Sequence, residues 1–352
     1  MILDAARVLL PFIASFSVGV LLAPLLSHFL YTFKAWKKKS GKGKGLGDDT
    51  GTPLFDELHR VREISAPRMG GILVWISVAL VAGGFASLAF FFGGVWEELD
   101  FIYRGQTWLP LFALLCGGVI GLLDDFLEVS QSDGGLPLSF RLLLVTLLSA
   151  FAGLWFYDKL DVSAIGIPLL GPFELGILFV PFFILVTLAL YASGIIDGID
   201  GLAGGIFAII FMAYAGIGFA QEQYSLAAFS AAVSGSLFAF LWFNIPPARF
   251  YLSETGTMGL TLALSVTAFS TDVLAEGSGV GVLPIIALPL TATVLTSIAQ
   301  VVSKKFFGKK LFHIAPIHHH FEAIGWPPYK VAMRYWVITI ISSVLGLSLA
   351  LL

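Results

Sequence analysis

Residues 202–220 read LAGGIFAIIFMAYAGIGFA, an apolar run of 19 residues that contains no charged side chain. A helix needs about 20 apolar residues to cross the hydrocarbon core of a bilayer, so this run is long enough to span it. Similar runs recur along the whole chain, in which 57% of the residues are hydrophobic and 12% are charged, about half the charged fraction of a soluble domain. The sequence therefore predicts a polytopic integral membrane protein.

The apolar runs predict an all-α integral membrane protein with about ten transmembrane helices, in which residues 1–352 form a single domain. The expected spans are 5–33, 70–95, 108–124, 138–157, 174–192, 202–220, 226–243, 256–271, 282–303 and 332–352. The run 162–173 contains Gly and Pro and is expected to be a loop. The N-terminal stretch lacks a basic n-region and an A-x-A site, so we expect it to be the first span rather than a cleaved signal peptide.

Lysine and arginine are divided unequally between the two sets of loops. Seventeen of the 20 basic residues fall on one side of the predicted spans, and only Arg7, Arg104 and Lys159 fall on the other. Because cytoplasmic loops carry the excess of basic residues, both termini are expected on the outer side of the membrane. The cytoplasmic loops are then those near residues 34–69, 125–137, 193–201, 244–255 and 304–331.

The longest basic stretch is KKKSGKGKGLGDDTG at residues 37–51, which is rich in glycine and lysine. Its simplest expected role is attraction to anionic lipid headgroups. Holding a phosphorylated substrate is the alternative.

Carboxylates at the ends of apolar helices need an explanation, because an unpaired charge in a membrane is costly. Asp124 and Asp125 end the third span, and their mutual repulsion calls for a cation or a shared proton. Asp197 and Asp200 lie three residues apart in a Gly-rich turn, so on a helical turn they would share a face. Each pair alone could also be a solvated helix end or an ordinary turn.

Two further polar clusters lie on the same predicted side. Asn244, Arg249, Tyr251 and Glu254 crowd one short loop, although Arg249 and Glu254 could be a plain ion pair. Residues 315–322 read APIHHHFE, and consecutive helical residues differ in direction by about 100°. The three histidines therefore cannot form a metal cage by themselves, but one or two could bind phosphate or carry a proton.

These groups are mainly hard oxygen ligands, and the one cysteine, Cys116, lies inside an apolar run. The set favours Mg²⁺ or Mn²⁺ over zinc, and Mg²⁺ with a few carboxylates and substrate phosphates is usual in phosphoryl transfer. The sequence has no Walker A motif, which disfavours an ATP-driven pump. Charges gathered at one interface also disfavour a transporter, which places them near the midplane. We expect a metal-dependent site for a phosphorylated substrate at the cytoplasmic interface.

At these residues the chain resembles the polyprenyl-phosphate N-acetylhexosamine-1-phosphate transferases, and within them the muramoyl-pentapeptide branch. The resemblance covers nearly the whole chain. The motifs that carry it are PRMGG at 67–71, DD at 124–125, DGIDGLA at 197–203, WFN at 242–244 and LFHIAPIHHHFE at 311–322. The last motif is the most specific, because its His-rich form separates this branch from its relatives.

The resemblance implies transfer of phospho-N-acetylmuramoyl-pentapeptide from UDP-N-acetylmuramoyl-pentapeptide to undecaprenyl phosphate, with lipid I and UMP as products, in peptidoglycan biosynthesis. Such a reaction is mostly positioning and charge stabilisation. The resemblance also implies Mg²⁺, or Mn²⁺ in its place, and a homodimer in the bacterial inner membrane. The active site would face the cytoplasm, and no nucleic-acid partner is implied.

Residue roles follow from the same resemblance. Catalytic roles would fall to Asp124, Asp125, His318 and His320; substrate binding to Asp197, Asp200, Asn244, Tyr251, Gln300 and His319; and metal binding to Glu254, Asp124 and Asp125. Either aspartate of the adjacent pair could deprotonate or position the lipid phosphate. Tyr251 would stack on uracil.

Several positions depart from the family's motifs. Glu254 replaces an Asp, Glu128 a Lys, Arg68 a Thr, and Tyr191 and Gly194 two Asn residues. Arg141 could supply a missing basic group. Two alternatives therefore stay open: a related polyprenyl-phosphate GlcNAc-1-phosphate transferase, and a homologue that binds without turnover.

Overall fold

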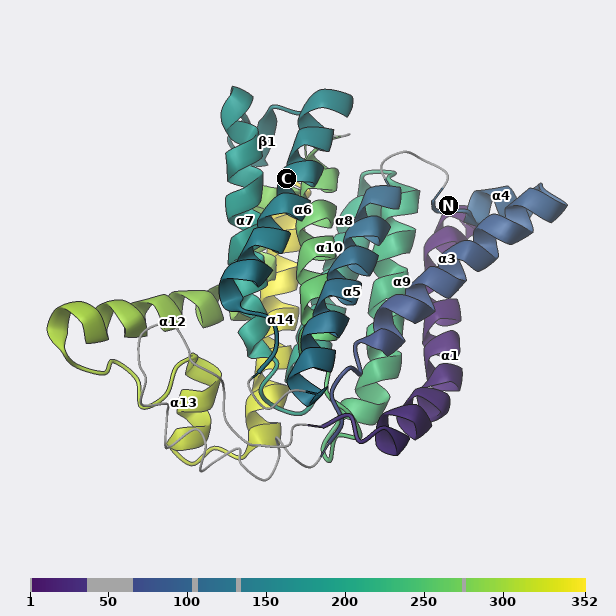
Figure 1. Ribbon diagram of the computed structural model, residues 1–352. Helices are drawn as coiled ribbons and strands as arrows, with labels where there is room; N and C mark the ends of the chain where they lie inside the picture. The colour runs from purple at the N-terminus through teal and green to yellow at the C-terminus, as the bar shows by residue number, and fades with distance from the viewer. Residues whose placement is uncertain (1, 37–65, 103–106, 131–133, 274–276) are drawn as a thin grey trace.

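The computed structural model describes residues 2–36, 66–102, 107–130, 134–273 and 277–352. The basic stretch 37–51 lies outside this part of the chain. The described residues form a bundle of long helices, and both chain termini lie at the same end of it (Figure 1).

The elements have the following bounds in chain order. The helices are α1 (Ile2–Thr32), α3 (Ile72–Phe92), α4 (Val95–Leu99), α5 (Trp108–Ser130), α6 (Leu138–Lys159), α7 (Phe179–Ser193), α8 (Leu202–Ala220), α9 (Tyr224–Asn244), α10 (Ser253–Val273), α11 (Gly279–Ile286), α12 (Leu288–Phe307), α13 (Ile317–Ala323) and α14 (Pro328–Ala350). Two strands, β1 (Ala164–Ile167) and β2 (Gly171–Glu174), and two short 3₁₀ helices, η1 (Gly176–Leu178) and η2 (Gly194–Ile196), complete the described chain.

The prediction of a mostly helical, multi-pass membrane protein is confirmed. Among the described residues, eight helices are long and apolar enough to cross a membrane, or nine if α11 and α12 together form one broken span. Each of the ten expected spans coincides with helical structure. The number of ten crossings stays a prediction.

Helix α10 is a predicted span that is too polar to be counted with the eight. It packs against α5, α7 and α11 in the bundle. The hydroxyls of Thr261, Thr267 and Ser270 are buried, and each donates to the carbonyl one turn earlier in the helix. Other helices therefore surround α10 on several sides. Its buried hydroxyls tolerate this burial because each has a hydrogen-bond acceptor within the helix.

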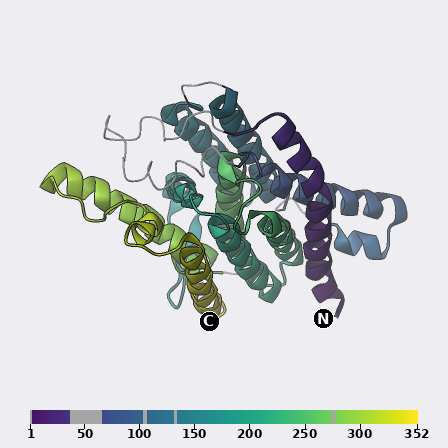
Figure 2. The ribbon, with the colours of Figure 1, turned by 90° about the horizontal axis from the view of Figure 1, so that it is seen from below.

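The expected span 282–303 is wrong as a single straight helix. The axes of α11 and α12 differ by 73°. Pro289 lies in the first turn of α12. A proline there lacks an amide hydrogen and its ring collides with the carbonyl four residues earlier, so the helix cannot continue straight. Helix α12 therefore leaves the bundle and projects to one side, opposite α4 (Figures 1 and 2).

The expectation of a loop over 162–173 is also wrong, because this run forms a hairpin. Strands β1 and β2 pair antiparallel, from Ala164 opposite Glu174 to Ile167 opposite Gly171. Gly171 has a φ of 82°, a conformation that glycine adopts readily, and it closes the turn. Hydropathy alone does not register such a short pair of strands.

Candidate active site

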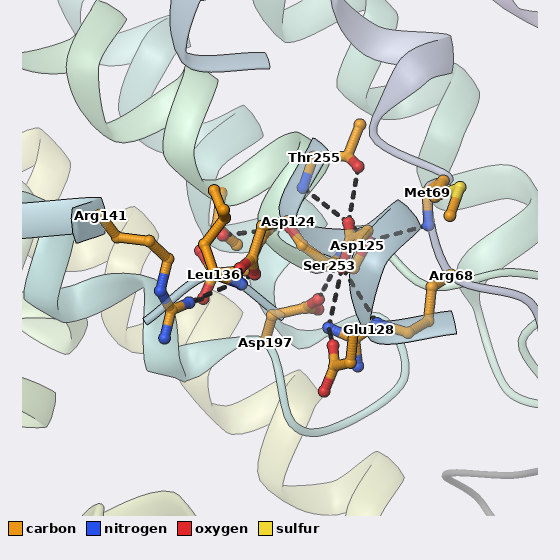
Figure 3. Close-up of polar contacts among 12 residues, drawn as sticks. Arg68, Met69, Asp124, Asp125, Glu128, Leu136, Arg141, Asp197, Ser253 and Thr255 are labelled. Carbon is orange, nitrogen blue, oxygen red and sulfur yellow. Dashed lines mark hydrogen bonds and ion pairs between the residues drawn. The ribbon is translucent and has the colours of Figure 1, made fainter. Parts of the chain in front are cut away.

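The candidate active site lies where the start of α3, the end of α5 and the start of α10 meet, at the end of the bundle opposite the termini (Figures 1 and 3). Three glycines permit this approach. A Cβ at Gly71 would overlap the backbone of Gly256, and a Cβ at Gly121 would overlap the carbonyl of Glu254. Their backbones can therefore touch, which brings the polar groups of the three helices within hydrogen-bonding distance.

Asp125 is fully buried at the centre of this site (Figure 3). Its Oδ2 accepts hydrogen bonds from Ser253 Oγ at 2.5 Å, Thr255 N at 2.8 Å and Thr255 Oγ1 at 2.6 Å. Its Oδ1 lies 3.0 Å from both Nε and Nη2 of Arg68. A buried carboxylate is tolerated only with such partners, so Asp125 ties α5 to the start of α10 and to the segment before α3.

Ser253 connects three parts of the site. Its backbone N–H donates to Asp197 Oδ2 at 2.6 Å, and its Oγ both donates to Asp125 and accepts from Met69 N at 2.9 Å. Ser253 has a φ of 53°, which is unfavourable for a residue with a Cβ and is held by these hydrogen bonds. The sequence reasoning assigned no role to Ser253 or Thr255. The available signal was that both hydroxyl residues flank Glu254.

Arg68 pairs with two carboxylates. Besides Asp125, its Nη2 lies 2.9 Å from Glu128 Oε2. Burial would lower the pKa of Arg68, but the neighbouring carboxylates of Asp125 and Glu128 raise it above its ordinary value. Arg68 and Glu128 are two of the positions that depart from the family's motifs, and here they form one ion pair. The two departures therefore compensate each other.

Arg141 makes a second bridge, between α5 and α10. Its Nη1 lies 2.9 Å from Glu254 Oε1 and 3.4 Å from Asp124 Oδ2. Asp124 Oδ1 accepts from Leu136 N at 2.6 Å. Arg141 Nε is buried and has no hydrogen-bond partner among the described residues. Glu254, the longer residue at an expected Asp position, thus faces Arg141, the residue expected to supply a missing basic group.

Asp197 and Asp200 lie in the loop between η2 and α8. Burial raises the pKa of Asp197 to about 6, an effect that the hydrogen bond from Ser253 N partly opposes. Asp200 Oδ2 accepts from Ala248 N at 3.2 Å, which holds the loop between α9 and α10. Asp197 is therefore linked to Asp125 through Ser253, whereas Asp200 supports a neighbouring loop.

The three histidines of α13 do not face one way, as helical geometry predicts. His318 and His319 are buried, and His319 Nδ1 lies 2.8 Å from Glu322 Oε2. A Cβ at Gly198 would lie 2.6 Å from His319 Nε2, so this ring touches the loop that carries Asp197. His320 instead stacks on the ring of His313, with centroids 5.3 Å apart.

Two residues expected to bind substrate hold backbone segments here. Asn244 accepts from Gly201 N at 2.9 Å and donates to Phe250 O at 2.8 Å. Gln300, on α12, accepts from Leu311 N at 3.0 Å and from Phe312 N at 2.9 Å, and donates to Phe312 O at 3.1 Å. Their contact with substrate stays a prediction.

Tyr251, the third of this group, pairs through its backbone with the PRMGG segment. Its N–H donates to Pro67 O at 2.8 Å, and its carbonyl accepts from Gly70 N at 2.8 Å. Its place against uracil stays a prediction.

The structure brings together four of the predicted carboxylates. Arg141 contacts Asp124 and Glu254, Ser253 bonds to Asp125 and Asp197, and the two sets adjoin in the chain at 124–125 and 253–254, so the four carboxylates form one network of contacts. Among the described residues, no group of three or more His, Cys, Asp or Glu side chains is placed to bind a metal unaided. A Mg²⁺ ion bound with substrate phosphates needs only one or two carboxylates. Asp124 and Glu254 fit that requirement, because their oxygens converge on Arg141 Nη1.

Comparison with known proteins places this site in context. Residues 107–272, which contain all four carboxylates of the network, match the model of glycosyl transferase family 4. Phospho-N-acetylmuramoyl-pentapeptide-transferases are similar over most of the chain. The relative from Dichelobacter nodosus is 33% identical over 82% of this chain and 81% of its own length. The relative from Geobacillus sp. is 31% identical over 96% of both chains, and that from Acetivibrio thermocellus 32% over 95% of this chain and 93% of its own.

Proposed function

Because the chain belongs to the phospho-N-acetylmuramoyl-pentapeptide transferase family, we propose that it transfers phospho-N-acetylmuramoyl-pentapeptide from UDP-N-acetylmuramoyl-pentapeptide to undecaprenyl phosphate. The products are UMP and lipid I, a precursor of peptidoglycan. The observation that carries the proposal is the set of contacts between α5 and α10, in which Arg141 bridges Asp124 and Glu254 while Asp125 accepts hydrogen bonds from Ser253 and Thr255. This network lies at one end of a membrane bundle, where a lipid phosphate and a water-soluble nucleotide sugar can meet.

The two adjacent aspartates have different roles in this proposal. Both oxygens of Asp125 are engaged by Arg68, Ser253 and Thr255. Among the described residues, Asp124 Oδ2 makes a single contact, the long one of 3.4 Å to Arg141. A general base needs a lone pair that can reach the substrate proton. Asp124 is therefore the residue that deprotonates or positions the lipid phosphate, and Asp125 holds the helices around it.

Mg²⁺ is the proposed cofactor, with Mn²⁺ as a substitute. Asp124 and Glu254 would hold it, and water and substrate phosphates would complete its shell. Asp125, which sequence reasoning included among the ligands, already has partners for both oxygens. When bound, the cation offsets the negative charge of the two phosphorylated substrates.

The nucleotide sugar would lie against the surface formed by the loop that carries Asp197 and helix α13. The contact between Gly198 and His319 supports this placement, because it brings the Asp197 loop and the histidine motif of α13 side by side. His318 would lie near the phosphates, as would His320. Asp200 and Tyr251 complete the same region from the loops around α8 and α10.

The proposed topology has ten crossings, both termini outside and the active site facing the cytoplasm of a bacterial inner membrane. The common location of the termini at one end of the bundle and the 17 of 20 basic residues on the other side support it. A homodimer is proposed from the family resemblance alone. Accessibility of cysteines introduced at Arg7 and at Lys310 to an impermeant thiol reagent would test the topology.

The function is tested by UMP release from UDP-N-acetylmuramoyl-pentapeptide with undecaprenyl phosphate in detergent or vesicles. Wild-type protein should release UMP, and Asp124→Asn should release it more slowly by about 100-fold or more, while it keeps the elution profile of the folded protein. Arg7→Gln is a matched control, because Arg7 pairs with Glu98 at the other end of the bundle. Full activity of Asp124→Asn would refute its role as base.

The same assay separates the alternatives. A polyprenyl-phosphate GlcNAc-1-phosphate transferase would release UMP with UDP-N-acetylglucosamine and not with the muramoyl-pentapeptide. A homologue without turnover would bind the nucleotide sugar but release no UMP with either. Competition between both nucleotide sugars in one reaction gives the preference directly.

A further inference from the structure

Arg141 comes from α6, yet its guanidinium lies between carboxylates of two other helices. The contacts are 2.9 Å to Glu254 on α10 and 3.4 Å to Asp124 on α5, and both involve the same atom, Nη1 (Figure 3 shows the contact with Asp124). Asp124 is 3% exposed, and the side chain of Glu254 is 28% exposed. A cationic nitrogen therefore occupies the point on which the two proposed metal ligands converge.

A divalent cation and a guanidinium nitrogen cannot share that point, because both are positive and both need the same oxygens. At a separation of about 4 Å, like charges repel strongly even when partly screened, so the two cations compete for these oxygens. We propose that Arg141 is an internal cation that occupies the divalent-metal position between Asp124 and Glu254, so that metal binding requires it to leave Glu254. The inference rests on the proposed function only for the assignment of these two carboxylates to a metal.

The length of Glu254 is consistent with this arrangement. Glutamate reaches one methylene further from its helix than the aspartate expected here, and its Oε1 is the closer of the two partners of Arg141. The departure at 254 and the arginine at 141 thus act as a pair, as Arg68 and Glu128 do on the other side of Asp125.

Arg141 also has capacity for another partner once it leaves Glu254. Its buried Nε has no hydrogen-bond partner among the described residues. The side chain is 21% exposed, so protein does not enclose it on all sides. A guanidinium presents several N–H groups in a planar fork that matches phosphate oxygens. The released side chain would therefore face the anionic substrate rather than remain unpaired.

The direct test is Mn²⁺ binding to the full-length protein in detergent, followed by the electron paramagnetic resonance signal of free Mn²⁺. We expect Arg141→Gln to bind Mn²⁺ more tightly than the wild type by about tenfold or more, because a like charge has been removed. Arg7→Gln should leave the affinity unchanged, because Arg7 also lies among carboxylates, Asp4 and Glu98, but at the opposite end of the bundle. An equal or weaker affinity in Arg141→Gln would overturn the proposal.

A second measurement uses the wild-type protein, in case Arg141→Gln does not fold. Phenylglyoxal modifies accessible arginines, and mass spectrometry reports the rate at each position. Saturating Mn²⁺ should raise the modification rate of Arg141 severalfold and leave that of Arg7 unchanged. An Arg141 rate that Mn²⁺ does not raise would show that the cation does not displace it.

These outcomes are distinguishable from failure of the proposed function. If Mn²⁺ binds more tightly to Arg141→Gln but the wild type releases no UMP, the role of Arg141 stands and the transferase proposal fails. If the wild type releases UMP but the Mn²⁺ affinity of Arg141→Gln does not rise, the transferase proposal stands and the role of Arg141 fails.

Discussion

Ser253 Oγ lies 2.5 Å from Asp125 Oδ2, although the two residues are 128 positions apart in the chain. The contact joins the end of α5 to the start of α10 and fixes the carboxylate around which the site is arranged. It also helps to hold Ser253 at a φ of 53°, which is unfavourable for a residue with a Cβ.

Ser253→Ala should therefore destabilise the protein. The substitution removes one donor to a buried carboxylate and leaves Met69 N without its acceptor, so the free energy of unfolding should fall by about 2–3 kcal/mol. Unfolding in mixed micelles by SDS titration would measure it. Ser234→Ala, which removes a buried hydroxyl that donates to Ala208 O, should cost only about 1 kcal/mol. Equal losses in both variants would contradict the special role of Ser253.

Asp125→Asn and Asp124→Asn should have different consequences. Asp125→Asn removes the charge of a fully buried carboxylate that pairs with Arg68 and accepts hydrogen bonds from Ser253 and Thr255, and breaking such a pair costs about 3–5 kcal/mol. Asp124→Asn removes only the long contact of 3.4 Å to Arg141, which keeps Glu254 at 2.9 Å. This variant should therefore keep the melting temperature near that of the wild type and reduce kcat by about 100-fold or more, as expected for a lost general base. The pair of variants, measured for both melting temperature and UMP release, distinguishes an anchor from a base. A stable Asp125→Asn protein would contradict this division.

Asp197 should make stability depend on pH. Its pKa of about 6 in the folded protein exceeds the ordinary value of 3.8, so between these values the folded protein binds more protons than the unfolded chain. The free energy of unfolding must then fall as pH rises through this window, by about 2–3 kcal/mol in total. Below pH 4 and above pH 6 this contribution no longer changes.

The test is the melting temperature of Asp197→Asn and wild type at pH 4.5 and 7. The wild type should lose more stability between these values than Asp197→Asn, which cannot titrate at this position. Asp161→Asn, at an exposed position, controls for the loss of one negative charge. Parallel pH profiles for wild type and Asp197→Asn would contradict the prediction.

Glu254 should set the requirement for Mg²⁺. Removal of divalent cations with a chelator should abolish UMP release, and added Mg²⁺ should restore it. In Glu254→Ala, the Mg²⁺ concentration for half-maximal activity should rise by about tenfold or more, because one of two carboxylate ligands is lost. Glu98→Ala, at the other end of the bundle, is the control. Normal Mg²⁺ dependence in Glu254→Ala would show that this residue does not bind the metal.

Gly71→Ala should be far more damaging than Gly84→Ala, although both alter one glycine in or beside α3. A Cβ at 71 would overlap the backbone of Gly256, and the resulting displacement should cost about 3 kcal/mol or more. A Cβ at 84 has nothing within 4 Å and should stabilise the helix slightly, by up to about 1 kcal/mol. SDS titration of both variants checks the difference. Similar stability of the two would mean that the helices separate easily at Gly256.

The sequence predicts the helices well where they are uniformly apolar. The expected span 202–220 has the same bounds as α8. The break before α12 was missed, because hydropathy averages over Pro289 and does not register a change of direction. The polar α10 was expected as a span, and the burial of its hydroxyls among other helices could not be predicted from its hydropathy.

The site was predictable in part. Carboxylates in apolar surroundings are conspicuous, so Asp124, Asp125 and Glu254 could be grouped before their contacts were known. Ser253 and Thr255 gave a weaker signal, since many hydroxyls in α10, such as that of Thr261, only bond to their own helix. The Arg68 and Arg141 bridges could not be assigned, because a charge pair between distant segments depends on packing that no local pattern encodes.

The close backbone contacts at Gly71, Gly121 and Gly256 limit how this end of the molecule can move during turnover. Helices whose main chains are already in contact cannot move closer together without a steric clash. Rearrangements on the time scale of catalysis must then come from side-chain rotations and from loops. The helices would then stay fixed during turnover, and a change of rotamer at Arg141 would be the movement that admits the metal.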